Sequence, residues 1–166
     1  MAFNDPGGDG VAGWLAFFVV VIGLLSPLRI LISVYSGLYG DPAAASFFAE
    51  VWTRLQAFEW TMAALSIAGC WYIVWRLFNV QRWSTVRVTI VGIWLLGVGL
   101  LLVDSLGAAL IAGISPGVVM AEIPPQELVQ PLIFGSIWTA YFLLSKRVAN
   151  TYPRHPEHEE LREPFE

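Results

Sequence analysis

Long apolar stretches recur four times along the chain. Each one is long enough to cross a hydrocarbon core about 30 Å thick, which takes about 20 residues of helix. The apolar positions are continuous rather than alternating, which favours helices over the strands of a membrane barrel. The pattern predicts an all-α integral membrane four-helix bundle over residues 11–152, with helices at about 11–37, 43–79, 86–112 and 127–148.

Glycine, proline and polar residues separate the predicted helices. The segment 36–42 lies between the first two, where Asp41 suits an N-cap and Pro42 suits a first helical position. The segment 113–125 contains three prolines and lies between the last two. Residues 1–10 are predicted to be a flexible N-terminus. Residues 153–166 hold five glutamates and three prolines, which predicts a disordered acidic C-terminal tail.

The start of the second helix is ambiguous in the sequence. Apolar side chains recur on one helical face, whereas Glu50 and Arg54 form a favourable i,i+4 pair on the other. No glycine or proline interrupts residues 43–68. Residues 43–56 therefore either extend the helix beyond the bilayer or bend along its interface, and both alternatives stay open.

Positive charges are distributed unequally between the two ends of the predicted bundle. Three arginines flank the second connection and the C-terminal segment carries four basic residues, Lys146, Arg147, Arg154 and Arg162, whereas the first connection has one and the third has none. Because short cytoplasmic connections are enriched in Lys and Arg, the N- and C-termini are both predicted to be cytoplasmic. The predicted lipid anchors at this inner face are Arg76, Arg82, Arg87, Lys146 and Arg147.

Three ionisable residues lie inside the predicted spans, where charge is costly. At 1.5 Å per helical residue, Arg29, Glu59 and Asp104 all lie about 25 to 27 Å from the inner face. We interpret them as a polar cluster that faces the bundle and lines a cavity open to the outer side. In the competing interpretation each side chain extends to the outer headgroups, or they pair for structure alone.

A proline stands close to this level. Pro27 removes one backbone N–H and clashes with the carbonyl of Gly23, which predicts a kink. The functional interpretation is an opened backbone near Arg29. The alternative is an ordinary membrane-helix proline, since prolines are frequent in such helices.

Composition excludes several classes of function. Charged residues make up 13% of the chain, against about 25% in soluble domains, so the bilayer is the solvent that fits. A single cysteine, Cys70, rules out an intramolecular disulfide, and both histidines lie in the polar tail. No basic stripe for nucleic acid is present. The sequence predicts no catalytic residue, no metal site and no cofactor.

Motifs in the first and last helices resemble a known family. They are Gly13–Leu15, Ser26–Arg29, Trp138, Tyr141–Phe142, Ser145–Val148 and Asn150–Tyr152. Together with four helices in this length, they resemble domain-of-unknown-function family 2569, small bacterial membrane proteins, over residues 10–153. The resemblance implies a multi-pass protein of the bacterial inner membrane, and it implies no activity.

Three classes of function are compatible with these features. The favoured hypothesis is an accessory or structural subunit that associates laterally with a larger bacterial membrane complex. The alternative is a small transporter or channel that uses the outer polar cluster, although four helices form a narrow pore unless the protein is a homo-oligomer. A membrane enzyme ranks last. The expected partners are the lipid bilayer and either a larger complex or further copies of the chain, with no nucleic acid.

Overall fold

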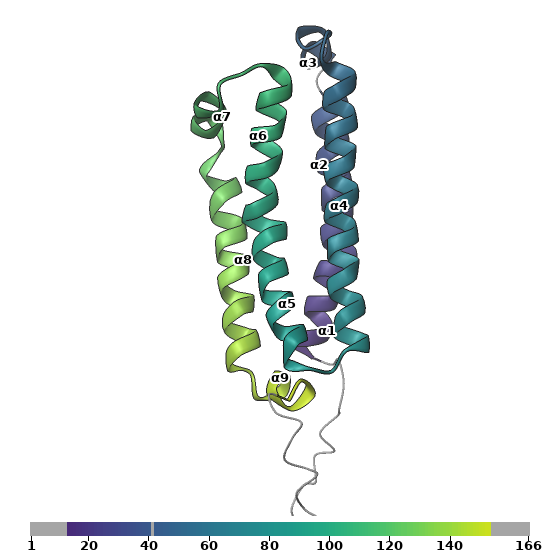
Figure 1. Cartoon of the computed structure of the whole chain (residues 1–166), viewed down its shortest axis with the longest axis vertical. Helices are drawn as coiled ribbons and strands as arrows, with labels where there is room; N and C mark the ends of the chain where they lie inside the picture. The colour runs from purple at the N-terminus through teal and green to yellow at the C-terminus, as the bar shows by residue number, and fades with distance from the viewer. Residues whose placement is uncertain (1–12, 41, 154–166) are drawn as a thin grey trace, which may run out of the picture.

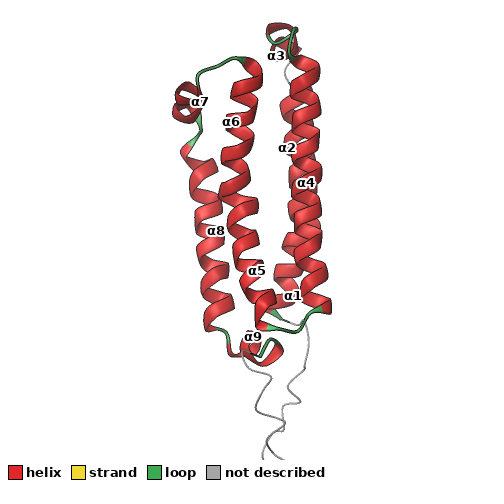
Figure 2. Ribbon diagram, viewed as in Figure 1, coloured by secondary structure: helices red, strands yellow, loops and turns green. Residues whose placement is uncertain are grey.

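The protein is an elongated bundle of long helices (Figure 1). A computed structural model describes residues 13–40 and 42–153, so the predicted N-terminal segment 1–10 and nearly all of the predicted tail lie outside the described residues. The described part contains helices and connecting turns and no strand (Figure 2). Four helical stretches are long and apolar enough to cross a membrane, which confirms the all-α four-span prediction.

The spans divide into shorter elements, and two of them contain a π-helical turn. The first span consists of α1 (Trp14–Val20), η1 (Val21–Leu25) and α2 (Ser26–Tyr39), and the second is α4 (Trp52–Asn79). The third consists of α5 (Trp83–Trp94), η2 (Leu95–Gly99) and α6 (Leu100–Ala112), and the fourth is α8 (Pro125–Leu144). The short helices are α3 (Pro42–Phe47), α7 (Pro116–Glu122) and α9 (Lys146–Thr151).

The structure corrects the predicted single helix over 43–79. The chain turns at residues 48–51 between α3 and α4, and the Val51 N–H donates to the carbonyl of Phe48 at 2.9 Å. The turn brings Phe48 onto a cavity, whereas Phe47 stays 81% exposed. A straight extension of α4 is therefore ruled out, and a position of α3 along the interface stays a prediction.

The other helix limits differ less from prediction. The predicted helix over 127–148 is divided at Ser145, whose backbone is extended and whose hydroxyl accepts from the Val148 N–H at 3.4 Å, as an N-cap for α9. The third span begins earlier than residue 86, at Trp83, and the first extends past residue 37 to Tyr39. The segment 113–125, expected only to separate helices, forms α7.

The main core lies at the end of the bundle where α9 meets the α4–α5 turn. Phe18 of α1 packs against Trp138 and Phe142 of α8, with ring centroids 4.6 and 5.0 Å apart. Tyr152, fully buried, donates its hydroxyl to the carbonyl of Leu77 at 2.6 Å. This α9 end is closed by aromatic packing and by α9 itself (Figure 1).

Candidate functional site

A cavity of about 510 Å³ lies between the helices in the half of the bundle nearer α3. Residues of α2, the α3–α4 turn, α4, η2 and α6 line it. Most of the lining is apolar and includes Phe48, Trp52 and Met62. Its two ionisable residues are Glu59 and Asp104, so the cavity combines apolar walls with two acidic groups.

The two acidic residues lie at similar depth on facing helices. Glu59 follows the start of α4 by seven residues and Asp104 precedes the end of α6 by eight, so both lie about 10 to 12 Å inside the bundle. Both side chains are half-buried. Among the described residues, Asp104 Oδ1 is buried with no hydrogen-bond partner. A buried carboxylate oxygen is costly unless it accepts a hydrogen bond or neighbours a cation.

Arg29 hydrogen-bonds to a residue other than these carboxylates. Its Nη2 donates to Oε1 of Gln130 at 3.0 Å, and this exposed hydrogen bond links α2 to α8. Arg29 lies ten residues before the end of α2, about 15 Å inside the bundle, and so near the depth of the acids. It does not line the cavity. The structure brings Glu59 and Asp104 together and gives Arg29 a different partner.

Pro27 follows a π-helical turn rather than an opened backbone. The first span stays helical from Trp14 to Tyr39, with the wider turn η1 immediately before Ser26. The carbonyl of Gly23, four residues before the proline, accepts from the indole Nε1 of Trp71 at 3.2 Å. A side chain of α4 thus satisfies the carbonyl that Pro27 deprives of its helical donor.

The predicted anchor residues gather at the α9 end. Arg76 donates from Nη1 to the hydroxyl of Tyr72 at 3.1 Å and from Nη2 to the hydroxyl of Ser84 at 3.2 Å. Arg82, Arg87, Lys146 and Arg147 are exposed. Arg82 lies in the α4–α5 turn, Arg87 in the first half of α5, and Lys146 and Arg147 in α9. The α4–α5 turn and α9 lie at the same end of the bundle (Figure 1). Anchoring to lipid stays a prediction for all five.

The residues around the acids were missed at the sequence level. On α4 the cavity is lined by a series at helical spacing, which comprises Trp52, Leu55, Glu59, Met62, Ala63 and Ser66. Counting three and four residues in both directions from Glu59 finds most of them. Gly97 of η2 gives no such signal, because its position depends on a π-helical turn. No group of three or more His, Cys, Asp or Glu side chains converges in the described part of the chain.

Comparison with known proteins gives one match. No curated protein and no solved structure matches the chain. The family described as protein of unknown function (DUF2569) matches residues 9–153, which span all four long helices as well as α3, α7 and α9. The match confirms the resemblance of the first and last helices. The chain therefore belongs to domain-of-unknown-function family 2569.

Proposed function

We propose that the protein is a small transport or solute-binding protein of the bacterial inner membrane, and that its cavity takes a positively charged group. The observation that carries the proposal is the convergence of Glu59 and Asp104 on a cavity whose lining includes no Lys, Arg or His. The sequence favoured an accessory role. The cavity leads us to rank transport or solute binding first, because two acidic groups on facing membrane spans are costly without a compensating cation.

The lining supports an organic cation as the solute. Trp52 and Phe48 offer aromatic faces, which attract cations, and the remaining walls are mostly apolar. A ligand with an ammonium or phosphonium centre and apolar substituents would meet carboxylates and apolar surface together. With two carboxylates and no third acidic, His or Cys ligand, the lining suits such a ligand better than a bare metal ion.

We base the proposed orientation of the protein in the membrane on the distribution of its arginines. The α4–α5 turn and α9 lie at one end of the bundle (Figure 1), and we propose that this end and both termini are cytoplasmic. The cavity then belongs to the outer half of the membrane. A cationic solute would enter from the outer leaflet or the outer aqueous phase.

Binding of tetraphenylphosphonium to the purified full chain tests this proposal. We expect saturable binding by the wild type, followed by equilibrium dialysis, and about tenfold weaker binding by the double variant Glu59→Gln, Asp104→Asn. The matched control is Glu127→Gln, since Glu127 is an exposed acid of α8 that does not line the cavity. Absence of saturable binding by the wild type, or equal loss in the control, contradicts the proposal. Gel filtration and helical circular dichroism verify folding.

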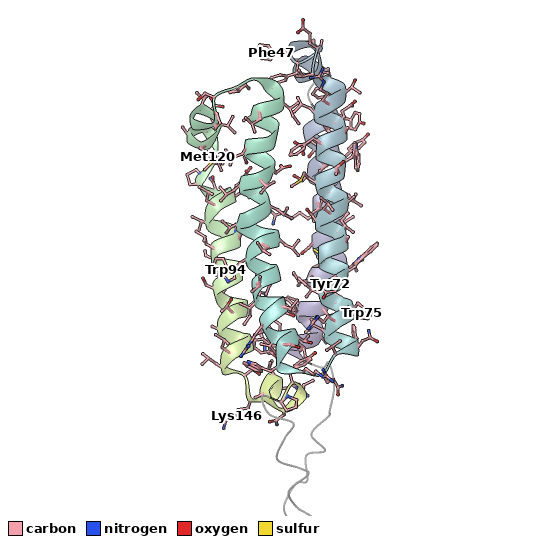
Figure 3. All side chains as sticks on the ribbon, in the orientation of Figure 1. Phe47, Tyr72, Trp75, Trp94, Met120 and Lys146 are labelled. Atoms are coloured by element: carbon pink, nitrogen blue, oxygen red, sulfur yellow. The ribbon has the colours of Figure 1, made fainter. Side chains whose placement is uncertain are left out.

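An accessory role is the second candidate, and a different surface favours it. Apolar side chains of α3 and α7 are exposed where the chain leaves the long spans, among them Phe47, Val118 and Met120. Phe47 and Met120 lie at the same end of the bundle (Figure 3). We expect a partner subunit to co-purify in stoichiometric amount in gentle detergent and to be lost in Phe47→Ser. A lone, homogeneous protein argues against this role.

A further inference from the structure

A second groove lies between α4 and α5 in the half of the bundle nearer α9. It has a volume of about 380 Å³, and residues of α4, α5 and the start of η2 line it, among them Tyr72, Arg87, Val91 and Leu95. Apart from Arg87 and the hydroxyl of Tyr72, the lining is apolar. Val91 and Leu95 are 56% and 59% exposed, so the groove faces outward, where lipid surrounds a membrane bundle.

Two glycines bring the helices together beneath this groove. A Cβ atom on Gly92 would come within 2.6 Å of Ile73 Cδ1, and one on Gly69 within 2.8 Å of Leu96 Cδ2. Close approach at small residues is the usual packing of membrane helices. The groove along this seam is lined almost entirely by apolar atoms, which suits a hydrocarbon chain.

Two arginines lie near the α9 end of the groove. Arg87 lines the groove itself, and Arg76 donates to the hydroxyl of Tyr72, which also lines it. Arg76 lies three residues before the end of α4 and Arg87 four after the start of α5, so both are within about 6 Å of the helix ends. This depth is that of lipid headgroups when the spans cross a bilayer.

The described segment that forms the groove supplies no counter-charge for these arginines. Residues 60–103 include Arg76, Arg82 and Arg87 and contain no Asp or Glu. Arg76 is held by the neutral hydroxyls of Tyr72 and Ser84, and its Nε is buried without a hydrogen-bond partner in the described part of the chain. An anion beside the groove would complement both guanidinium groups, and guanidinium pairs well with phosphate.

We propose that this groove binds one anionic glycerophospholipid, with an acyl chain along the α4–α5 seam and the headgroup phosphate between Arg87 and Arg76. The site is independent of the cavity that holds Glu59 and Asp104. It also goes beyond general anchoring, because it assigns the retained lipid to a particular groove and distinguishes Arg87, which lines it, from Arg82, which does not.

Native mass spectrometry of the full chain tests the site. The detergent-purified protein is incubated with equal amounts of phosphatidylglycerol and phosphatidylcholine that carry the same acyl chains. We expect one phosphatidylglycerol molecule to be retained preferentially, by about fivefold or more, as is reasonable for a charge-assisted contact. Arg87→Gln should bring the ratio near one. Arg87 is exposed, so the variant should fold.

Two further variants separate the groove from general electrostatics. Arg82→Gln removes an exposed arginine of the α4–α5 turn that lies outside the groove, and it should keep the preference. Val91→Phe fills the groove from its exposed side and should lower retention of both lipids while the arginines remain. The proposal is overturned if Arg82→Gln and Arg87→Gln lose the preference equally, or if Val91→Phe retains as much lipid as the wild type.

Discussion

At the residue scale, one side chain ties the last described segment to the bundle. Tyr152 follows α9 and is fully buried, and its hydroxyl donates to the carbonyl of Leu77 in the last turn of α4. Carbonyls in a last turn have no intrahelical donor, so this hydrogen bond meets a need of α4 as well. Burial raises the pKa of Tyr152 to about 12. The residue therefore favours the neutral, hydrogen-bonding phenol.

Replacement of Tyr152 by Phe should destabilise the bundle by about 1 kcal/mol, the usual net value of one hydrogen bond. The folded pKa of Tyr152 lies above the unfolded value of 10.0, so its contribution is present below pH 10 and is lost as the pH rises towards 12. The free energies of unfolding of the wild type and of Tyr152→Phe, measured in detergent, should differ less at about pH 11 than at about pH 8. A stability difference that is the same at both pH values would contradict a stabilising role for the Tyr152 hydroxyl.

At the element scale, the contact between α5 and α8 depends on the indole of Trp94, which packs against Gly135. Trp94, labelled in Figure 3, donates from Nε1 to the hydroxyl of Thr139 at 3.1 Å. Gly135 lies one turn before Thr139, and a Cβ there would come within 3.2 Å of the Trp94 ring. The hydrogen bond limits how far the ring can shift. The pair of α8 positions thus fixes the separation of the two helices.

Replacement of Gly135 by Ala should lower stability in detergent by about 1 to 3 kcal/mol, as overpacking does. The expected cause is displacement of Trp94 from Thr139, which tryptophan fluorescence can detect. Gly37→Ala is the matched control, since a Cβ at Gly37 meets nothing within 4 Å. If both alanine variants unfold at the same denaturant concentration, the helix separation is not set by this contact.

The long elements were predictable from sequence and the short ones were not. Each span is an apolar run whose length the bilayer dictates, so hydropathy alone places it. The turn before Trp52 contains no glycine or proline, so the sequence gives no signal of a helix end there. The start of α9 depends on an N-cap at Ser145. Residue counting predicted a shared level for Glu59 and Asp104, and the two lie at similar distances from the ends of α4 and α6. It did not predict the partner of Arg29, because Gln130 is 101 residues away and the pair depends on how α2 and α8 are placed.

At the scale of the whole molecule, the two ends of the bundle differ in packing. Aromatic rings and α9 close one end, whereas the larger cavity lies towards the other, between α2, α4 and α6. The α4–α5 turn lies at the closed end (Figure 1), with Arg82 in the turn, Arg76 near the end of α4 and Arg87 near the start of α5. A solute that reaches Glu59 and Asp104 would therefore come from the side of α3 and α7, and orientation in the membrane decides which compartment that is.

Cysteine labelling decides the orientation. Gln81→Cys lies in the exposed α4–α5 turn and Glu122→Cys at the exposed end of α7. The sole native thiol, Cys70, is buried and should stay unlabelled. With cytoplasmic termini, a membrane-impermeant maleimide should label Glu122→Cys in intact cells and Gln81→Cys only after permeabilisation, because charge bias places the arginines in and around the α4–α5 turn inside. The reverse pattern would invert the bundle, and the cavity that holds Glu59 and Asp104 would then open towards the cytoplasm.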